Sequence, residues 1–214
     1  MDAVVVDYGI VNLKNVVRGL EHVGARVTVS ADPKIIERAD RVILPGVGAF
    51  SAGMNELHTL GLDDALKNFA IGGRPILGIC LGMQMLLSYS LEYGHHEGLG
   101  LITGSVLPIP IGDEKDGGKS WKVPHIGWTS LDIPIGHTGW SHSCLADTPP
   151  GTYFYFVHSF MVVPDDPKYV LGQCFYESLA LIGAVRKENI TGVQFHPERS
   201  GLAGLAVLSR FVST

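Results

Sequence analysis

The chain has 214 residues, including 27 glycines and 12 prolines, and a formal net charge of −5. This length suits one domain over residues 1–214, the scattered lysines and arginines argue against a nucleic-acid partner, and the apolar stretches are too short to cross a membrane. Three widely spaced cysteines without a C-x-x-C pair, and a start without a basic leader, predict a cytoplasmic protein without structural zinc.

The first half of the sequence alternates between apolar, strand-like runs and helical patterns. This alternation is typical of βαβ units that build a buried parallel sheet. We predict strands at residues 3–7, 26–30, 41–46 and 75–80, and helices at about 12–23, after residue 33, in turns between 53 and 69, and at 81–90.

A glycine-rich loop, LPGVGAF at residues 44–50, follows the third predicted strand. It differs from a dinucleotide-binding loop, because Ser51 occupies the third glycine position of G-x-G-x-x-G and the loop does not follow the first strand. Two interpretations remain: a tight turn, or a wall of backbone N–H groups that holds an oxyanion.

Cys80 stands where the strand at 75–80 meets the next helix, between Gly78 and Gly82. The spacing G-x-C-x-G is that of the nucleophile elbow G-x-S-x-G, a strained turn that only small flanking residues permit. Such a turn aims the first N–H groups of the helix at the attacked atom and stabilises a thiolate. The alternative is a free cysteine packed as a small hydrophobic residue.

The second half of the sequence has a different character. Strand-like runs separated by turn residues predominate, and helical periodicity returns only near the C-terminus. We therefore predict an α/β fold with a mixed, mostly parallel sheet flanked by helices and an antiparallel, strand-rich second half. The predicted strand runs are 100–110, 121–133, 151–163, 169–176 and 179–195, and the helix is 201–213.

His196 and Glu198 lie two residues apart in GVQFHPERS, directly after an apolar run. In an extended chain, residues i and i+2 project from the same face, so the carboxylate would orient the imidazole. Pro197 favours an extended His196 at the end of a strand. An ordinary surface turn is the alternative, but together with the Cys80 elbow a Cys–His–Glu triad is favoured.

Three motifs in chain order, PGVGAF, GICLGMQ and GVQFHPERS, resemble the signatures of the triad-type (class I) glutamine amidotransferases. DYGIVNL, EGLGLITGSV, VPHIGW and YFVHSF resemble the glutaminase subunits of imidazole glycerol phosphate synthases, which serve histidine biosynthesis. The resemblance runs from Asp7 to Ser200. It implies a flavodoxin-like fold, L-glutamine as substrate, no cofactor and no metal. It also implies a (β/α)-barrel cyclase as partner in a heterodimer that makes imidazole glycerol phosphate and AICAR.

The same resemblance implies roles for individual residues. The nucleophile would be Cys80, its base His196, and the partner of that base Glu198. Glu92 would also lie three helical turns beyond Cys80, on the same face. The other implied positions are Val47, Gly48 and Leu81 for the oxyanion hole, Gly48, Gln84, Glu92, Ser159 and Phe160 for the substrate, and His125 and Trp128 for the partner interface.

Four positions depart from the pattern of that family, and one of them, Arg199 in place of a lysine, keeps the charge. Val11 replaces a glycine, which affects the local turn. Phe160 replaces a tyrosine near the substrate carboxylate, and Thr129 replaces an asparagine near the interface. Two other functions remain as alternatives: a free-standing triad cysteine hydrolase of related fold, and a regulatory subunit that only binds a partner.

Overall fold

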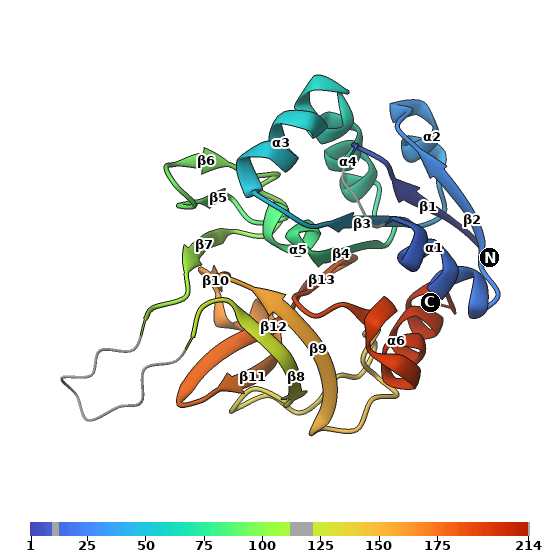
Figure 1. Ribbon diagram of the computed structural model, residues 1–214. Coiled ribbons are helices and arrows are strands. Elements are labelled where there is room, and N and C mark those ends of the chain that lie inside the picture. Colours follow the sequence, from blue (N-terminus) through green and yellow to red (C-terminus); the bar gives the residue numbers. More distant parts are fainter. Residues whose placement is uncertain (10–12, 112–121, 214) are drawn as a thin grey trace.

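The computed structural model describes residues 1–9, 13–111 and 122–213, so Val11 lies outside the described residues. Within these ranges the main sheet has seven strands, with neighbouring strands β13, β4, β3, β1 and β2 parallel and β12 and β11 antiparallel at one edge (Figure 1). This confirms the predicted mixed, mostly parallel sheet. The strands, in sheet order, are β11 (Val170–Tyr176), β12 (Leu179–Lys187), β13 (Ile190–Val193), β4 (Ile76–Cys80), β3 (Val42–Gly46), β1 (Asp2–Val6) and β2 (Arg26–Ser30).

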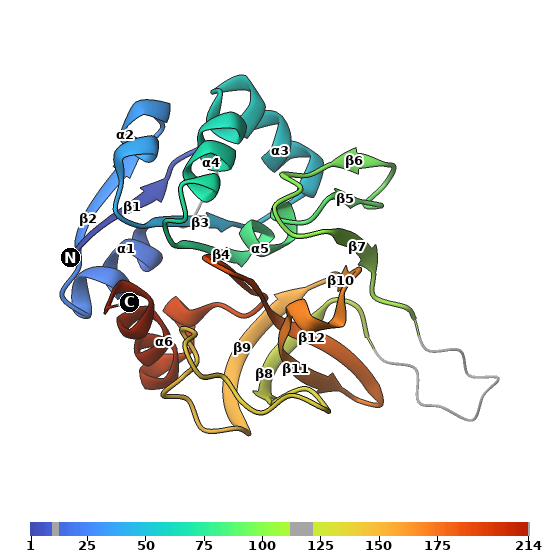
Figure 2. The ribbon, with the colours of Figure 1, turned by 180° about the vertical axis from the view of Figure 1, so that it is seen from behind.

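Helices cover both faces of the main sheet (Figures 1 and 2). Alternate residues of β1 enter two different cores: Val4 and Val6 pack on one side and Ala3 and Val5 on the other, as the two-residue period of a strand requires. The first side carries α2 (Pro33–Arg38), α3 (Phe50–Thr59) and α4 (Leu62–Ile71), and the second carries α1 (Leu13–His22) and α6 (Gly201–Ser213).

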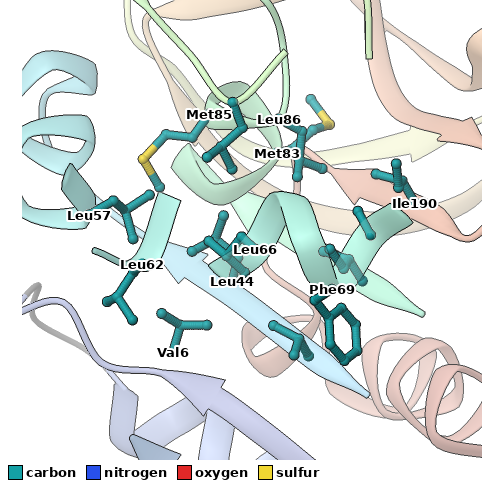
Figure 3. Packing of buried hydrophobic residues seen from close by; sticks show 14 of the residues in the cluster. Val6, Leu44, Leu57, Leu62, Leu66, Phe69, Met83, Met85, Leu86 and Ile190 are labelled. Carbon is teal, nitrogen blue, oxygen red and sulfur yellow. The ribbon is translucent and has the colours of Figure 1, made fainter. Parts of the chain in front are cut away.

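Figure 3 shows the core on the first side, where Leu62, Leu66 and Phe69 of α4 lie close to Leu44 of β3. Met83 and Met85 belong to the same core and come from the short helix α5 (Leu81–Met85). The start of α5, which directly follows Cys80, is therefore held by packing as well as by its own hydrogen bonds.

The second half is rich in antiparallel strands, as predicted. β8 (His125–Leu131) and β9 (Thr152–His158) form an antiparallel pair in which Trp128 lies opposite Tyr155. The other strands are β5 (Tyr89–Ser90), β6 (His96–Glu97), β7 (Gly104–Pro108) and β10 (Phe160–Pro164), and the 3₁₀ helices are η2 (Pro167–Tyr169) and η3 (Pro197–Arg199). No helix in the described residues has the length and apolar character needed to cross a membrane.

The predicted helix at 81–90 is wrong beyond Met85. The carbonyl groups that would continue the helix accept hydrogen bonds from a later segment instead: Met85 from the N–H of Leu99, and Leu86 from that of Ile102. Because these carbonyls already have partners, the chain leaves the helix and enters β5.

Candidate active site

Cys80 occupies the sharp turn that its flanking glycines predicted. It joins β4 to α5 with φ of 54° and ψ of −109°, a strained backbone for a residue other than glycine. A Cβ added to Gly82 would lie 1.7 Å from the carbonyl oxygen of Leu44, and one added to Gly78 would lie 2.8 Å from the backbone of Gly82. Strand and helix therefore pass too closely for any larger residue, which confirms the elbow.

The glycine-rich loop lies beside this elbow. In the parallel pairing of β3 with β4, Gly46 is the partner of Cys80. The Tyr8 hydroxyl donates to the carbonyl oxygen of Pro45 at 2.7 Å, and this hydrogen bond anchors the end of β3 just before the loop. Gly48 has φ of 104°, in the region that favours glycine. The loop thus brings backbone next to the thiol, as an oxyanion-holding wall requires.

His196 is held in place by its backbone. Its N–H donates to the carbonyl oxygen of Tyr155 on β9 at 2.9 Å. The Ser200 hydroxyl donates to the carbonyl oxygen of His196 at 2.7 Å, and its oxygen accepts from the N–H of Tyr155 at 3.0 Å. One residue of β9 therefore fixes His196 on two sides, directly and through Ser200.

The His196 ring and the Glu198 carboxylate form a buried pair, with Nδ1 and Oε1 2.8 Å apart. Burial lowers the pKa of His196, but the neighbouring Cys80 and Glu198 side chains outweigh burial and raise that pKa above its ordinary value. Nδ1 faces Glu198, and Nε2 has no hydrogen-bond partner among the described atoms, so Nε2 remains for Cys80. A protonated ring beside the sulfur favours a thiolate.

The pair forms by a different geometry from the one predicted. His196 is extended, with φ of −99° and ψ of 96°, but Glu198 lies in η3. The carboxylate therefore reaches the ring across a tight 3₁₀ turn, and the alternation argument was wrong for this step.

One cavity of about 820 Å³ joins these groups. The predicted site residues in its lining come from several parts of the fold. The cavity brings together the nucleophile, the base, the glycine-rich loop and the proposed substrate positions. Its lining includes Val47, Gly48, Cys80, Leu81, Gln84, Glu92, Ser159, Phe160 and His196.

The predicted substrate residues are anchored inside this cavity. The Gln84 amide nitrogen donates to the carbonyl oxygen of Phe160 at 3.2 Å. The Glu92 carboxylate accepts from the backbone N–H of Phe50, at the start of α3. Glu92 follows β5 and is not on a helix, so the argument that placed it three helical turns beyond Cys80 was wrong, although the residue does line the cavity.

The two predicted interface residues differ in exposure. Trp128 is 55% exposed on β8, whereas His125 is 1% exposed and stacks on Phe156 and Tyr176. The ring of His125 therefore lies in the core and is not available for direct contact, and the place of His125 at the partner interface stays a prediction. Thr129, the departure noted in the sequence, is a hydrogen-bond partner of that ring at 2.8 Å.

Two buried polar residues of the site were not predicted. His158 lines the cavity, and Gln194 contacts both Gln84 and the Cys80 sulfur. The sequence did carry a signal for Gln194, because it is a polar side chain inside the apolar run ITGVQF that leads to His196. In the described part of the chain, no group of three His, Cys, Asp or Glu side chains is placed to hold a metal ion.

Comparison with known proteins gives a consistent result. Residues 4–213 match the family described as "Glutamine amidotransferase class-I". The chain is 45% identical to imidazole glycerol phosphate synthase subunit HisH 1 of Legionella pneumophila (strain Lens), over 97% of each chain. It is 41% identical to subunit HisH of Geobacter sulfurreducens, over 97% of this chain and 96% of that protein.

Solved structures agree on the fold. A crystal structure of a glutamine amidotransferase has a TM-score of 0.72 at 16% identity, covering 98% of this chain and 97% of that one. The structure of PurLQS from Thermotoga maritima has a TM-score of 0.69 at 20% identity, covering 99% of this chain and 97% of that one. At these identities the likeness concerns architecture alone.

Proposed function

This chain belongs to the class-I glutamine amidotransferase family and groups with the HisH subunits of imidazole glycerol phosphate synthase, and we propose that it is the glutaminase subunit of such a synthase. It hydrolyses L-glutamine to glutamate and ammonia and passes the ammonia to a (β/α)-barrel cyclase subunit in histidine biosynthesis. The observation that carries this proposal is the cavity in which a strained Cys80 meets the buried His196–Glu198 pair.

The first half of the reaction uses the elbow. The Cys80 thiolate attacks the side-chain amide carbon of glutamine, and the carbonyl electron pair moves onto oxygen. Backbone N–H groups of Leu81 and of the Val47–Gly48 loop hold this oxyanion. The electron pair on oxygen then re-forms the carbonyl, the carbon–nitrogen bond breaks, and His196, protonated at Nε2, gives its proton to the departing nitrogen. Ammonia leaves and a glutamyl thioester remains on Cys80.

The second half reverses the roles of the same groups. His196, now neutral, takes a proton from water, and the water oxygen attacks the thioester carbon. The carbon–sulfur bond breaks, its electron pair returns to the Cys80 sulfur, and glutamate leaves. Glu198 keeps the ring oriented and stabilises its positive charge throughout.

The substrate end of the cavity carries complementary polar groups. We assign the Glu92 carboxylate to the α-ammonium group of glutamine, because opposite charges attract strongly in a partly enclosed site. Gln84 and the Ser159–Phe160 segment are assigned to the α-carboxylate end. No cofactor and no metal take part, and residues 1–214 act as one glutamine amidotransferase domain.

The cyclase partner is assigned to the exposed face of β8 around Trp128. Ammonia becomes ammonium in water at neutral pH and is then no nucleophile, so transfer to an acceptor needs a closed interface. The proposal includes a reducing, cytoplasmic location, which the three free thiols of the described residues support.

One assay tests the proposal against its alternatives. Glutamate release from glutamine is measured for the purified chain alone, then with the cyclase subunit, then with the cyclase and its nucleotide substrate. We expect low basal activity that the complex raises. Full activity in the lone chain, unchanged by the cyclase, would favour a free-standing hydrolase. No activity in any mixture would favour a regulatory subunit.

A further inference from the structure

Gln194 is a fully buried side chain between β13 and His196, and it touches the proposed nucleophile. Its backbone N–H donates to the carbonyl oxygen of Gly183 on β12 at 2.9 Å, which fixes it to the sheet. Its side-chain Nε2 lies 3.6 Å from the sulfur of Cys80, and its Oε1 lies 3.1 Å from the Nε2 of Gln84. Gln194 thus bridges the nucleophile and a residue of the substrate end.

The neighbours determine which way the Gln194 amide points. The carbonyl oxygen of Phe160 can only accept, so the Gln84 group 3.2 Å from it is the NH₂. The second hydrogen of that NH₂ points at Gln194, which must therefore present its oxygen to Gln84. The NH₂ of Gln194 then faces Cys80, and an amide nitrogen can only donate.

The sulfur of Cys80 consequently lies between one group that favours its thiol form and one that favours its thiolate form. The carbonyl oxygen of Val157, 3.9 Å away, accepts from an S–H and repels a thiolate. The Gln194 N–H bonds more strongly to a thiolate than to a thiol, because a hydrogen bond to an ionised acceptor is the stronger one.

We propose that Gln194 is a catalytic residue that holds the Cys80 sulfur and stabilises negative charge on it by donating a hydrogen bond from Nε2. The inference rests on the proposed function. Gln194 acts twice in that reaction: it supports the attacking thiolate, and it supports the sulfur again when the thioester carbon–sulfur bond breaks and the electron pair returns to sulfur. Its link through Gln84 to Phe160 keeps the donor aimed at the sulfur.

The test measures the sulfur directly and needs no glutamine turnover. The rate of Cys80 alkylation by iodoacetamide is followed from pH 5 to 8 by mass spectrometry, in the wild-type chain and in Gln194→Met, which has similar length and no donor. Loss of a hydrogen bond to a charged acceptor should slow alkylation at the acid end about tenfold. Gln173→Met, the same change on β11 away from the cavity, should leave the rate unchanged.

The chain contains its own folding control. Cys144 and Cys174 are buried away from the cavity that Cys80 lines, and burial raises the pKa of each thiol to about 12, so both stay unlabelled in any correctly folded variant. If Gln194→Met exposes them, Gln194→Leu replaces it in the same assay. A wild-type alkylation rate at Cys80, with the other two cysteines protected, would overturn the proposal.

Glutaminase assays of the same variants separate the two proposals. We expect kcat of the Gln194 variant with the cyclase to fall about tenfold as well. Slower alkylation of the variant, when the wild-type chain itself shows no glutaminase activity with the cyclase, would support the hydrogen bond from Gln194 to the Cys80 sulfur and refute the proposed function, and with it the catalytic role of Gln194. Normal alkylation in an active enzyme would refute only the Gln194 assignment.

Discussion

Acidification should destabilise this protein through two buried histidines, His125 and His158, that link β8 to the cavity. The carbonyl oxygen of Phe160 accepts from Nδ1 of His158 at 2.8 Å, so Nε2 of that ring must accept. It lies 3.0 Å from Nδ1 of His125, which therefore donates, and Nε2 of His125 accepts from the Thr129 hydroxyl at 2.8 Å. Every ring nitrogen has a defined role only when both rings are neutral.

The size of the effect follows from the pKa values of the two rings. Burial lowers the pKa of His125 to about 4, and burial together with the nearby His125 and His196 rings lowers that of His158 to about 3. An unfolded chain binds protons on both histidines below its ordinary pKa of about 6.5, whereas the folded chain does not. Stability is therefore lost as pH falls, by about 2 kcal/mol for each ring and about 4 kcal/mol for the pair at pH 5.

The assay is urea unfolding at pH 7.5 and pH 5.0 for the wild type and for the double variant His125→Asn/His158→Asn. Asparagine keeps a donor near the place of Nδ1 and does not titrate. His196 changes stability with the opposite sign, because its pKa is raised, but it is present in both proteins and cancels in the comparison. The exposed His142→Asn serves as the matched control and should behave as the wild type.

The double variant should lose about 4 kcal/mol less than the wild type between the two pH values. An equal loss in both proteins would refute the reasoning, since it would mean that the rings are protonated in the folded chain or contribute nothing to its acid sensitivity. In that case the hydrogen-bond directions assigned to the pair would also be wrong.

Three further predictions concern the proposed reaction. Cys80→Ala should abolish glutamine hydrolysis with little change in the urea midpoint, while alanine at either other cysteine keeps activity; turnover by a folded Cys80→Ala protein would exclude covalent catalysis. Glu198→Gln should lower kcat less than His196→Ala does, because loss of an orienting group usually slows catalysis less than loss of a base. An unchanged kcat in Glu198→Gln would show that the contact between His196 and Glu198 is only structural. Trp128→Ala should lower activation by the cyclase more than basal glutaminase activity, and equal losses of both would argue against a coupling role.

Periodicity predicted the elements of the main sheet and the last helix well. Strand 26–30 and helix 201–213 match β2 and α6 residue for residue. Both signals are local, since the alternation of polar and branched apolar residues in RVTVS and the apolar face of the last helix are each visible within one short stretch of sequence. The elbow was equally readable, because only glycine tolerates backbone as close as that around Gly78 and Gly82.

The segment after Cys80 shows where local reasoning fails. The run from Leu81 to Ser90 has a helical pattern, but α5 stops at Met85. The reason lies more than ten residues away in the sequence. The N–H groups of Leu99 and Ile102 donate hydrogen bonds to the carbonyl oxygens of Met85 and Leu86. Tertiary hydrogen bonds of this kind leave no periodic trace, so the position of Glu92 could not be worked out from helix geometry.

The backbone contacts of His196 connect the proposed base to the proposed partner surface on β8. Tyr155 lies opposite Trp128 in the β8–β9 pair, and the backbone of Tyr155 holds His196 directly and through Ser200. The exposed tryptophan and the proposed base are therefore joined by one residue of β9. In the proposed complex, a cyclase that shifts Trp128 would act on the strand whose Tyr155 holds the backbone of His196. Such a contact route becomes a coupling route only if a perturbation at one end changes the other, and the Trp128→Ala comparison measures that change.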